Sequence, residues 1–497
     1  RRGLSGGARA AAITLAGALG ESPLKVSIDR ARYRLGSNDF TAEGARAALG
    51  EGDGLTVMEA ASIDGRISAA GAQGRFADAA GHLATVPLRM SDAQGNWAFA
   101  RGALSLSGAI QVADAEKDKR FNPLVSSDMA LTLADGGITA SATLLSPGHA
   151  APIVRVAIAH DLETAAGHAD LTVPDIVFSE SFQPDRLTPL TYGVVAEVRG
   201  AVSGTGRIDW RRDGATGTGR FGTTGLDLDA AFGPVEGIAT ELTFTNLLNL
   251  ETAPGQQATV ARVNPGVAVE RGVIRYQLLP EQHVRIEEGR WPFAGGALIL
   301  APSDLDLAVS AERRLTFRLE GVDAGQFLQQ LDFKNLDATG VFDGVLPIMF
   351  NDKGGRIEAG ELRVREGGGT IAYVGEVSQE DLGFWGNTAF QALKSLRYKS
   401  LTVAMNGALD GDMITEVRFA GLSQGQGAKS NFLVRRLQRL PFVFNVRIKA
   451  PFRQLFDLSD PGGYAQRALS QGIVAPKTDA EPVQPPESDA MAKETSK

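Results

Sequence analysis

The stretch Phe442-Val443-Phe444-Asn445-Val446-Arg447-Ile448-Lys449 alternates apolar and polar residues with a period of two. Successive side chains of an extended strand point to opposite faces of a sheet, so this pattern predicts a β-strand with one apolar and one polar face. The same alternation recurs along the whole chain, for example in 315–320, 401–406 and 414–419. The sequence therefore predicts a mostly β protein built from antiparallel strands.

Glycine separates many of these alternating stretches. The chain has 59 glycines, whereas an average share of about 7% would give roughly 35. Glycine adopts the positive φ that two-residue hairpin turns need. Asp135-Gly136, Asn406-Gly407 and Asp410-Gly411 are therefore predicted to be turns that join antiparallel strands.

Helical periodicity is confined to a few short segments. The clearest runs from about residue 379 to 396, and shorter ones are predicted at 326–331 and around 464–469. We interpret each apolar stripe as a helix packed on the sheet. The alternative for 379–396 is a helix that lies on a membrane surface, since basic residues gather at its C-terminal end.

Composition excludes several classes of protein. Hydrophobic residues make up 43% of the 497-residue chain and charged residues 22%, which is enough apolar material for a core. The net charge of -8 argues against a nucleic-acid partner, because such proteins are normally basic. The absence of cysteine excludes disulfides, thiol catalysis and Cys-ligated metals. The sequence contains no run of 18 or more apolar residues, so it predicts no membrane-spanning helix.

The chain is expected to have three regions. Residues 1–250 form a repetitive β-groove region, residues 251–475 a C-terminal β domain with short helices, and residues 476–497 a disordered tail poor in apolar residues. The sequence begins Arg1-Arg2 rather than with Met, and we interpret it as a fragment whose N-terminal signal or anchor precedes Arg1.

Two motifs resemble known catalytic or nucleotide-binding patterns. Gly217-Thr218-Gly219-Arg220-Phe221-Gly222 matches Gly-x-Gly-x-x-Gly, but the following residues alternate like a strand instead of opening a helix. Gly421-Leu422-Ser423-Gln424-Gly425 matches the nucleophile elbow Gly-x-Ser-x-Gly, yet no histidine follows it, as the elbow requires. We expect neither a bound nucleotide nor an active Ser423.

The titratable residues show no metal-ligand spacing. The five histidines are scattered along the chain (His82, His149, His160, His168 and His283), and no group of carboxylates stands out as an acid–base pair. The sequence therefore predicts no catalytic residue, no metal and no cofactor.

A basic segment stands out in this acidic chain. Between Lys429 and Phe456 there are basic residues but no Asp or Glu. One interpretation is a surface that attracts anionic lipid headgroups; the other is the solvated polar face of an edge strand. The candidates for headgroup contact are Arg435, Arg436, Arg439, Arg447 and Lys449.

Several glycine-punctuated blocks between residues 272 and 407 resemble the YdbH-like domain, a branch of the AsmA-like envelope proteins that has also been labelled a dicarboxylate transport domain. Their order and spacing carry the resemblance more than any single block does. The blocks are Gly272-Val-Ile-Arg-Tyr276, Gly289-Arg-Trp-Pro-Phe-Ala-Gly-Gly296, Gly340-Val-Phe-Asp-Gly-Val-Leu-Pro-Ile348, Gly354-Gly-Arg-Ile-Glu-Ala-Gly-Glu-Leu362, Ile371-Ala-Tyr373, Ala392-Leu-Lys-Ser-Leu-Arg-Tyr-Lys-Ser-Leu401 and Asn406-Gly407.

The resemblance implies an elongated antiparallel sheet that is curled into a groove with an apolar inner face, a bridge-like β-solenoid. It also implies an inner-membrane anchor, a small outer-membrane lipoprotein that adds a strand to an exposed sheet edge, and phospholipid tails in the groove. The candidate groove residues are Phe442, Phe444, Val446 and Ile448. A dicarboxylate carrier would need spanning segments or a polar pocket, and the sequence shows neither.

Three functions are compared. The leading hypothesis is a non-enzymatic periplasmic protein that carries phospholipids between the inner and outer membranes along an apolar β-groove. The second is an envelope scaffold that binds nascent outer-membrane proteins through its sheet edge. The third, a serine hydrolase using Ser423, lacks a histidine partner.

Overall fold

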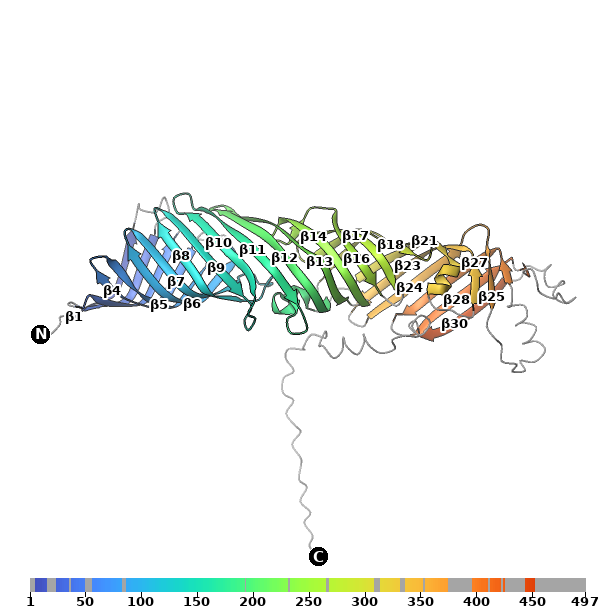
Figure 1. Cartoon of the computed structure of the whole chain (residues 1–497), viewed down its shortest axis with the longest axis horizontal. Helices are drawn as coiled ribbons and strands as arrows, with labels where there is room; N and C mark the ends of the chain where they lie inside the picture. Colours follow the sequence, from blue (N-terminus) through green and yellow to red (C-terminus); the bar gives the residue numbers. More distant parts are fainter. Residues whose placement is uncertain are drawn as a thin grey trace, which may run out of the picture.

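The computed structural model describes residues 5–15, 24–34, 37–49, 56–82, 86–192, 194–230, 233–264, 268–307, 313–330, 336–351, 354–373, 396–409, 412–421, 423–424 and 443–451. These residues form one long body whose strands follow one another along its length (Figure 1). Nearly every described element is a β-strand, as the alternating sequence predicts.

The strands of the first half are β1 (Ser5–Leu15), β2 (Leu24–Arg34), β3 (Asp39–Leu49), β4 (Thr56–Ser68), β5 (Gly71–His82), β6 (Leu88–Ala100), β7 (Ala103–Asp114), β8 (Leu124–Ala134), β9 (Gly137–Leu145), β10 (Pro152–Asp161), β11 (Ala166–Phe178), β12 (Val195–Arg211), β13 (Gly214–Ala230) and β14 (Gly233–Asn246).

The strands of the second half are β15 (Glu251–Thr252), β16 (Gln256–Val263), β17 (Val269–Leu279), β18 (His283–Phe293), β19 (Gly296–Leu300), β20 (Ser303–Asp306), β21 (Arg313–Asp323), β22 (Leu336–Thr339), β23 (Val341–Asn351), β24 (Gly354–Val364), β25 (Gly369–Tyr373), β26 (Leu396–Tyr398), β27 (Ser400–Ala408), β28 (Asp412–Ala420), β29 (Ser423–Gln424) and β30 (Val443–Pro451).

The main sheet contains 26 of these strands, and every described pairing in it is antiparallel. From β1 to β14 each strand pairs with the next one along the chain. At about 4.8 Å between neighbouring strands, such a sheet extends roughly 120 Å. A smaller sheet of β22, β25, β26 and β29 lies beside the C-terminal part. The predicted fold class, a curled and elongated antiparallel sheet with few helices, is confirmed.

The sheet is open at both ends of the strand order. β1 pairs with β2, and β30 pairs with β28; no described pairing joins β1 to β30. The order of the strands therefore makes a long groove with two ends, and β30 keeps one backbone edge without a partner strand among the described residues.

The hairpin turns follow the sequence prediction in one case and depart from it in another. Asp135 and Gly136 join β8 to β9 with φ of 48° and 75°, as a two-residue turn requires. The prediction for Asn406-Gly407 was wrong, because both residues lie inside β27. A Cβ at Gly407 would overlap the backbone of β28, so glycine is needed there for close approach. Asp410-Gly411 lies outside the described residues.

The predicted helices meet different outcomes. The one at 326–331 is confirmed as α1 (Ala324–Gln330), whose first turn is capped by Asp323 through the backbone N–H of Gln326. The predicted end of the 379–396 helix was wrong, because Leu396 begins β26 and pairs with Ile371. Residues 379–395 and the predicted helix at 464–469 lie outside the described residues.

Candidate functional site: the apolar face of the sheet

A continuous row of apolar and small residues crosses the sheet from β2 to β13. Each member pairs directly with the next, and directly paired residues of antiparallel strands share a sheet face. We call this set the apolar row: Tyr33, Phe40, Gly65, Gly74, Trp97, Leu106, Leu131, Ala140, Ile158, Ala169, Ile208 and Gly217.

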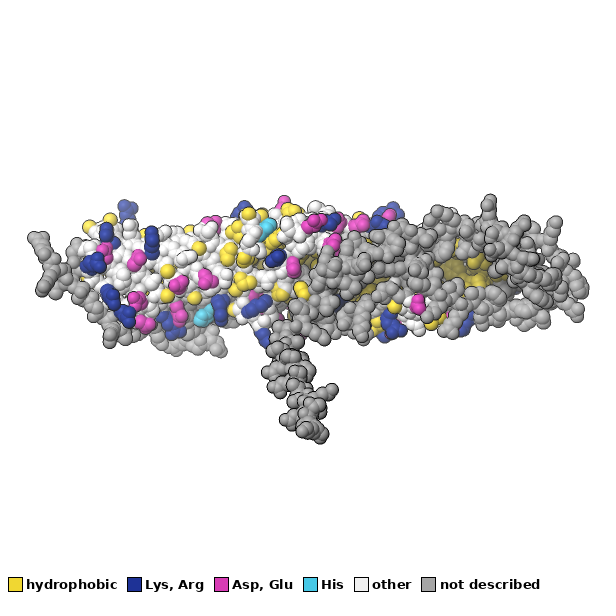
Figure 2. Space-filling model, turned by 90° about the horizontal axis from the view of Figure 1, so that it is seen from below, with side chains coloured by type: hydrophobic (Ala, Val, Ile, Leu, Met, Phe, Trp, Pro, Cys, Tyr) yellow, Lys and Arg dark blue, Asp and Glu magenta, His cyan; other side chains and the backbone are white. Residues whose placement is uncertain are grey.

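The positions one residue away form a polar row on the opposite face. All are polar except Ala130 and Ala157, and the members are Arg32, Thr41, Asp64, Arg75, Asn96, Ser107, Ala130, Ser141, Ala157, Asp170, Arg207 and Thr218. Because the register never slips between these rows, the two faces stay chemically distinct over the whole distance. Figure 2 shows polar and charged side chains over the N-terminal half and recessed hydrophobic ones toward the other end.

A second apolar row lies two positions further along the strands. It starts with Ile67, Ala72 and Phe99, continues through Leu104, Leu133 and Ile138, and ends with His160, Gly167, Trp210 and Ala215. His160 is its one polar member; burial lowers the pKa of its imidazole, and its Nδ1 accepts a hydrogen bond from Trp210 Nε1 at 3.1 Å. The ring is therefore neutral near pH 7, and the row carries no charge there.

The apolar face of β2–β7, which we call the N-terminal groove, is partly open to solvent. Ile67 is 46% exposed and Phe99 47%. Phe40 and Trp97 pack together with ring centroids 5.6 Å apart, and both lie over Gly65, where a Cβ would overlap them. The small residues between these rings leave apolar surface uncovered. Such surface is favourable for an apolar ligand and unfavourable in water.

The C-terminal half has the same alternation with a different filling. Its largest cluster of buried side chains, which we call the C-terminal core, reaches from Ala230 to Met413 and includes Trp291, Ile357 and Phe293. Helix α1 covers part of it: the ring of Phe327 lies edge-on to Phe293 at 5.9 Å. Here large buried side chains and α1 cover part of the apolar face, whereas the N-terminal groove has half-exposed Ile67 and Phe99.

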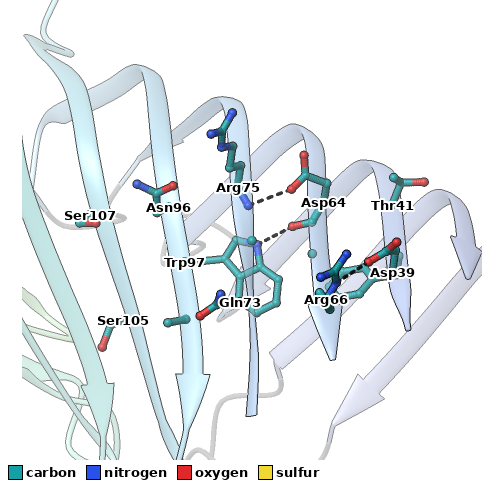
Figure 3. A pocket seen from close by; sticks show the side chains of 14 residues that line it. Asp39, Thr41, Asp64, Arg66, Gln73, Arg75, Asn96, Trp97, Ser105 and Ser107 are labelled. Carbon is teal, nitrogen blue, oxygen red and sulfur yellow. Dashed lines mark hydrogen bonds and ion pairs between the residues drawn. The ribbon is translucent and has the colours of Figure 1, made fainter. Parts of the chain in front are cut away.

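A shallow depression of about 920 Å³ lies over β3–β7 (Figure 3). Its lining is mostly polar and its carboxylates have partners: Arg66 binds Asp39 at 2.8 Å, and Asp64 Oδ1 accepts the backbone N–H of Arg75 at 3.1 Å. Trp97 Nε1 donates to the Asp64 carbonyl at 2.9 Å. Pairs like these stabilise a solvated sheet surface by little each, and we assign the depression a structural role.

The groove residues predicted from the sequence fall partly within the described residues. Phe444, Val446 and Ile448 lie in β30, opposite Phe419, Val417 and Thr415 of β28. Phe419 is 7% exposed and packs in a buried cluster with Tyr398. The three β30 positions therefore share a face with this cluster, and their role in a groove stays a prediction. Phe442 lies outside the described residues.

The residues predicted to contact headgroups also fall only partly within the described residues. Arg447 and Lys449 lie in β30, opposite Glu416 and Ile414 of β28, so both are on the other face from Phe444. Arg435, Arg436 and Arg439 lie outside the described residues, and headgroup contact by any of the five stays a prediction.

The catalytic and nucleotide motifs are parts of strands. Residues 217–222 lie in the middle of β13, so the Gly-x-Gly-x-x-Gly match has no helix N-terminus to hold a phosphate. Ser423 lies in β29, with its backbone paired to Arg397. Among the described residues, no cluster of three His, Asp or Glu side chains could hold a metal ion.

Sequence reasoning placed a β-groove in residues 1–250 but named no residue of the N-terminal groove. Its strands are rich in Ala and Gly, for example β5 (GAQGRFADAAGH), so their alternation is weak by hydrophobicity alone. The isolated aromatics Phe40, Trp97 and Phe99 were the signal that could have found it: Phe40 and Trp97 lie two residues from Ala42 and Gly95 on the same face, and Phe99 lies two residues from Trp97.

An open antiparallel sheet with continuous apolar rows on one face defines an elongated β-groove protein. The chain matches the family model of the YdbH-like proteins, described as intermembrane phospholipid transport protein YdbH, over residues 2–473. The chain therefore belongs to the YdbH-like family, and the resemblance inferred from its glycine-punctuated blocks is confirmed. Membership implies phospholipid binding and a location in the cell envelope.

Searches among curated proteins and among solved structures gave no match. None of the helices in the described part of the chain is both long and apolar enough to cross a membrane.

Proposed function

We propose that the protein is a periplasmic conduit that carries phospholipids between the inner and outer membranes along the apolar face of its sheet. The apolar row from Tyr33 to Gly217 carries this proposal, because every strand from β2 to β13 contributes an apolar or small residue to the same face. Each buried CH₂ of an acyl chain gains about 0.8 kcal/mol on such a surface. Movement along a uniform surface needs no bond chemistry, so the proposed function is not enzymatic.

The remaining parts of the chain fit this proposal. An anchor N-terminal to this sequence would hold the protein at the inner membrane, and a small outer-membrane lipoprotein would add a strand to the unpaired edge of β30. Phe442, Phe444, Val446 and Ile448 would continue the apolar path, while Arg435, Arg436, Arg439, Arg447 and Lys449 would contact anionic headgroups. We also propose the division into 1–250, 251–475 and a disordered tail, 476–497.

A second candidate function is an envelope scaffold for outer-membrane proteins. The buried C-terminal core favours it, since a scaffold needs a sheet edge and not an open groove. The open N-terminal groove favours the conduit, because exposed Phe99 and Ile67 gain nothing in a scaffold.

The test uses two adjacent residues on opposite faces. Phe99→Lys places a charge on the exposed apolar face, and Ala98→Lys places the same charge on the polar face. We expect the native chain and Ala98→Lys to retain radiolabelled phospholipid after incubation with vesicles, and Phe99→Lys to retain at least tenfold less. Equal retention by both variants would refute the conduit, and a folded native chain without bound lipid would favour the scaffold.

A further inference from the structure

The groove is covered midway by the chain itself. The connection between β11 and β12 contains two short 3₁₀ helices, Pro184–Arg186 and Pro189–Thr191, and lies near the middle of the body (Figure 1). We call its described residues 179–192 the strap. Phe182 of the strap is 5% exposed and stacks on Phe178 of β11 and on His149.

The surface beneath the strap is closed to solvent. Buried apolar side chains from β8 to β12 pack in one cluster with Phe182; they are Leu124, Leu144, Ile153, Ile176, Phe178 and Val198, each 8% exposed or less. The register places Leu124, Leu144, Ile176 and Phe178 on the face of the apolar rows. An acyl-wide passage would leave its walls accessible to a water-sized probe. The strap therefore covers the apolar face at these strand ends, between the N-terminal groove and the C-terminal core, and narrows the apolar path there.

The strap is hydrogen-bonded at both of its ends. Gln183 bridges to β12 by donating to the Val198 carbonyl and accepting the Val198 N–H, at 2.9 and 2.8 Å. At the other end, Leu187 O accepts the Asn122 N–H at 2.8 Å, and Thr188 Oγ1 donates to the Arg120 carbonyl at 2.6 Å. Asn122 and Arg120 belong to the β7–β8 connection (115–123).

The same connection reaches the opposite edge of the sheet. Arg120 Nη1 donates to the carbonyl of Leu248, which follows β14, at 2.8 Å. β7 and β14 are seven strands apart, which is roughly 34 Å along the strand order of the sheet. They run in opposite directions, so their C-terminal ends lie on the two opposite rims that the strand ends form. The contact exists because the sheet curls until the two rims formed by its strand ends meet. Val86 supports it, being 3% exposed and packed with Trp210.

The Arg120 side chain is held in position by Asp114, whose side chain has no exposed surface. Burial alone would raise the pKa of this carboxyl, but hydrogen bonds from the Arg120 side chain and from backbone N–H groups lower it to about 2. Asp114 is thus ionised at neutral pH and keeps the guanidinium pointed across the gap.

From this chain of contacts we propose that the strap is a gate: it closes the groove in the state described here and must lift away from β8–β12 for acyl chains to pass. This inference rests on the proposed function. Its polar links run to β12, through Gln183 and the Glu180–Arg199 ion pair, and to the β7–β8 connection, and the strap covers the sheet with few side chains. The strap can therefore separate without breaking the sheet pairing that holds the body together.

The test exploits the absence of cysteine. The Asn122–Leu187 backbone hydrogen bond brings two segments of the chain within the range of a disulfide, so the double variant Asn122→Cys/Leu187→Cys locks the strap on oxidation. Thr132→Cys/Thr139→Cys is the matched control, a disulfide between directly paired residues of β8 and β9 that leaves the strap free. Each full chain is incubated with vesicles that contain a phospholipid with a photoreactive acyl chain, and cross-linked peptides are mapped by mass spectrometry.

We expect the native chain, the control and the reduced lock to be cross-linked both in β4–β6 (Ile67, Phe99) and under the strap (Leu144, Phe178). The oxidised lock should keep the cross-linking in β4–β6, and its cross-linking under the strap should fall at least tenfold. Equal labelling under the strap in the oxidised lock would overturn the gate, as would labelling of β4–β6 with none under the strap in the native chain. No labelling anywhere would instead overturn the proposed function.

Discussion

The N-terminal groove and the C-terminal core share one sheet and one alternating pattern, yet they differ in what fills the apolar face. In the groove, Gly65 and Gly74 lie beside partly buried Trp97 and half-exposed Phe99. In the core, Trp291 is 4% exposed and covers Gly272, where a Cβ would overlap its ring. The alternation determines which face is apolar, and side-chain volume determines whether that face is open or closed.

The largest expected effect is on stability, when a tryptophan of each region is replaced by alanine. Trp291→Ala should destabilise the protein by about 3–5 kcal/mol, because it leaves a cavity in the C-terminal core. Trp97→Ala should cost less, about 1–2 kcal/mol, since Trp97 is only partly buried and loses one hydrogen bond and its contact with Phe40. Urea unfolding of both variants measures the difference, and equal costs would show that the groove is packed like the core.

A smaller effect concerns pH and the contact between the sheet edges. The folded pKa of Asp114 is about 2, below its ordinary value near 3.8, so its ionised form contributes stability above pH 4 that is lost as pH falls toward 2. The loss is on the order of 2 kcal/mol. Asp114→Asn should be less stable at pH 7 and should lack this part of the acid dependence in unfolding monitored by circular dichroism. An unchanged acid dependence would contradict the assignment to Asp114.

The smallest effect tests the open surface. Ile67 is 46% exposed, so Ile67→Ser should change the free energy of unfolding by less than about 1 kcal/mol. Its partner in the comparison is Leu319, which is 6% exposed in the C-terminal core and should cost several times more on the same substitution. A large loss at Ile67 would mean that another part of the protein covers the groove.

Much of this architecture was predictable from the sequence, and the reason is local. Period-two alternation at 315–320 or 414–419 determines strand and face without any knowledge of the neighbours. Asp135-Gly136 fixed its turn because both residues adopt positive φ. Asn406-Gly407 failed because glycine was needed for close approach to β28, which is a property of the partner strand.

The strap and the edge contact could not be predicted for the same reason. Arg120 and Leu248 lie 128 positions apart in the chain, and their hydrogen bond depends on how strongly the whole sheet curls. Leu396 shows the same limit: its helical stripe gave way to pairing with Ile371 in the smaller sheet. Contacts that depend on curvature or on a distant strand leave no short-range pattern.

The most direct test of the central claim is lipid mass spectrometry on the native chain purified from envelope extracts, beside Phe99→Lys purified in the same way. The account predicts phospholipid bound to the native chain and at least a tenfold depletion in the variant, with both folded by circular dichroism. A folded native chain free of phospholipid, or equal amounts in the two proteins, would contradict a lipid-carrying groove on the apolar face.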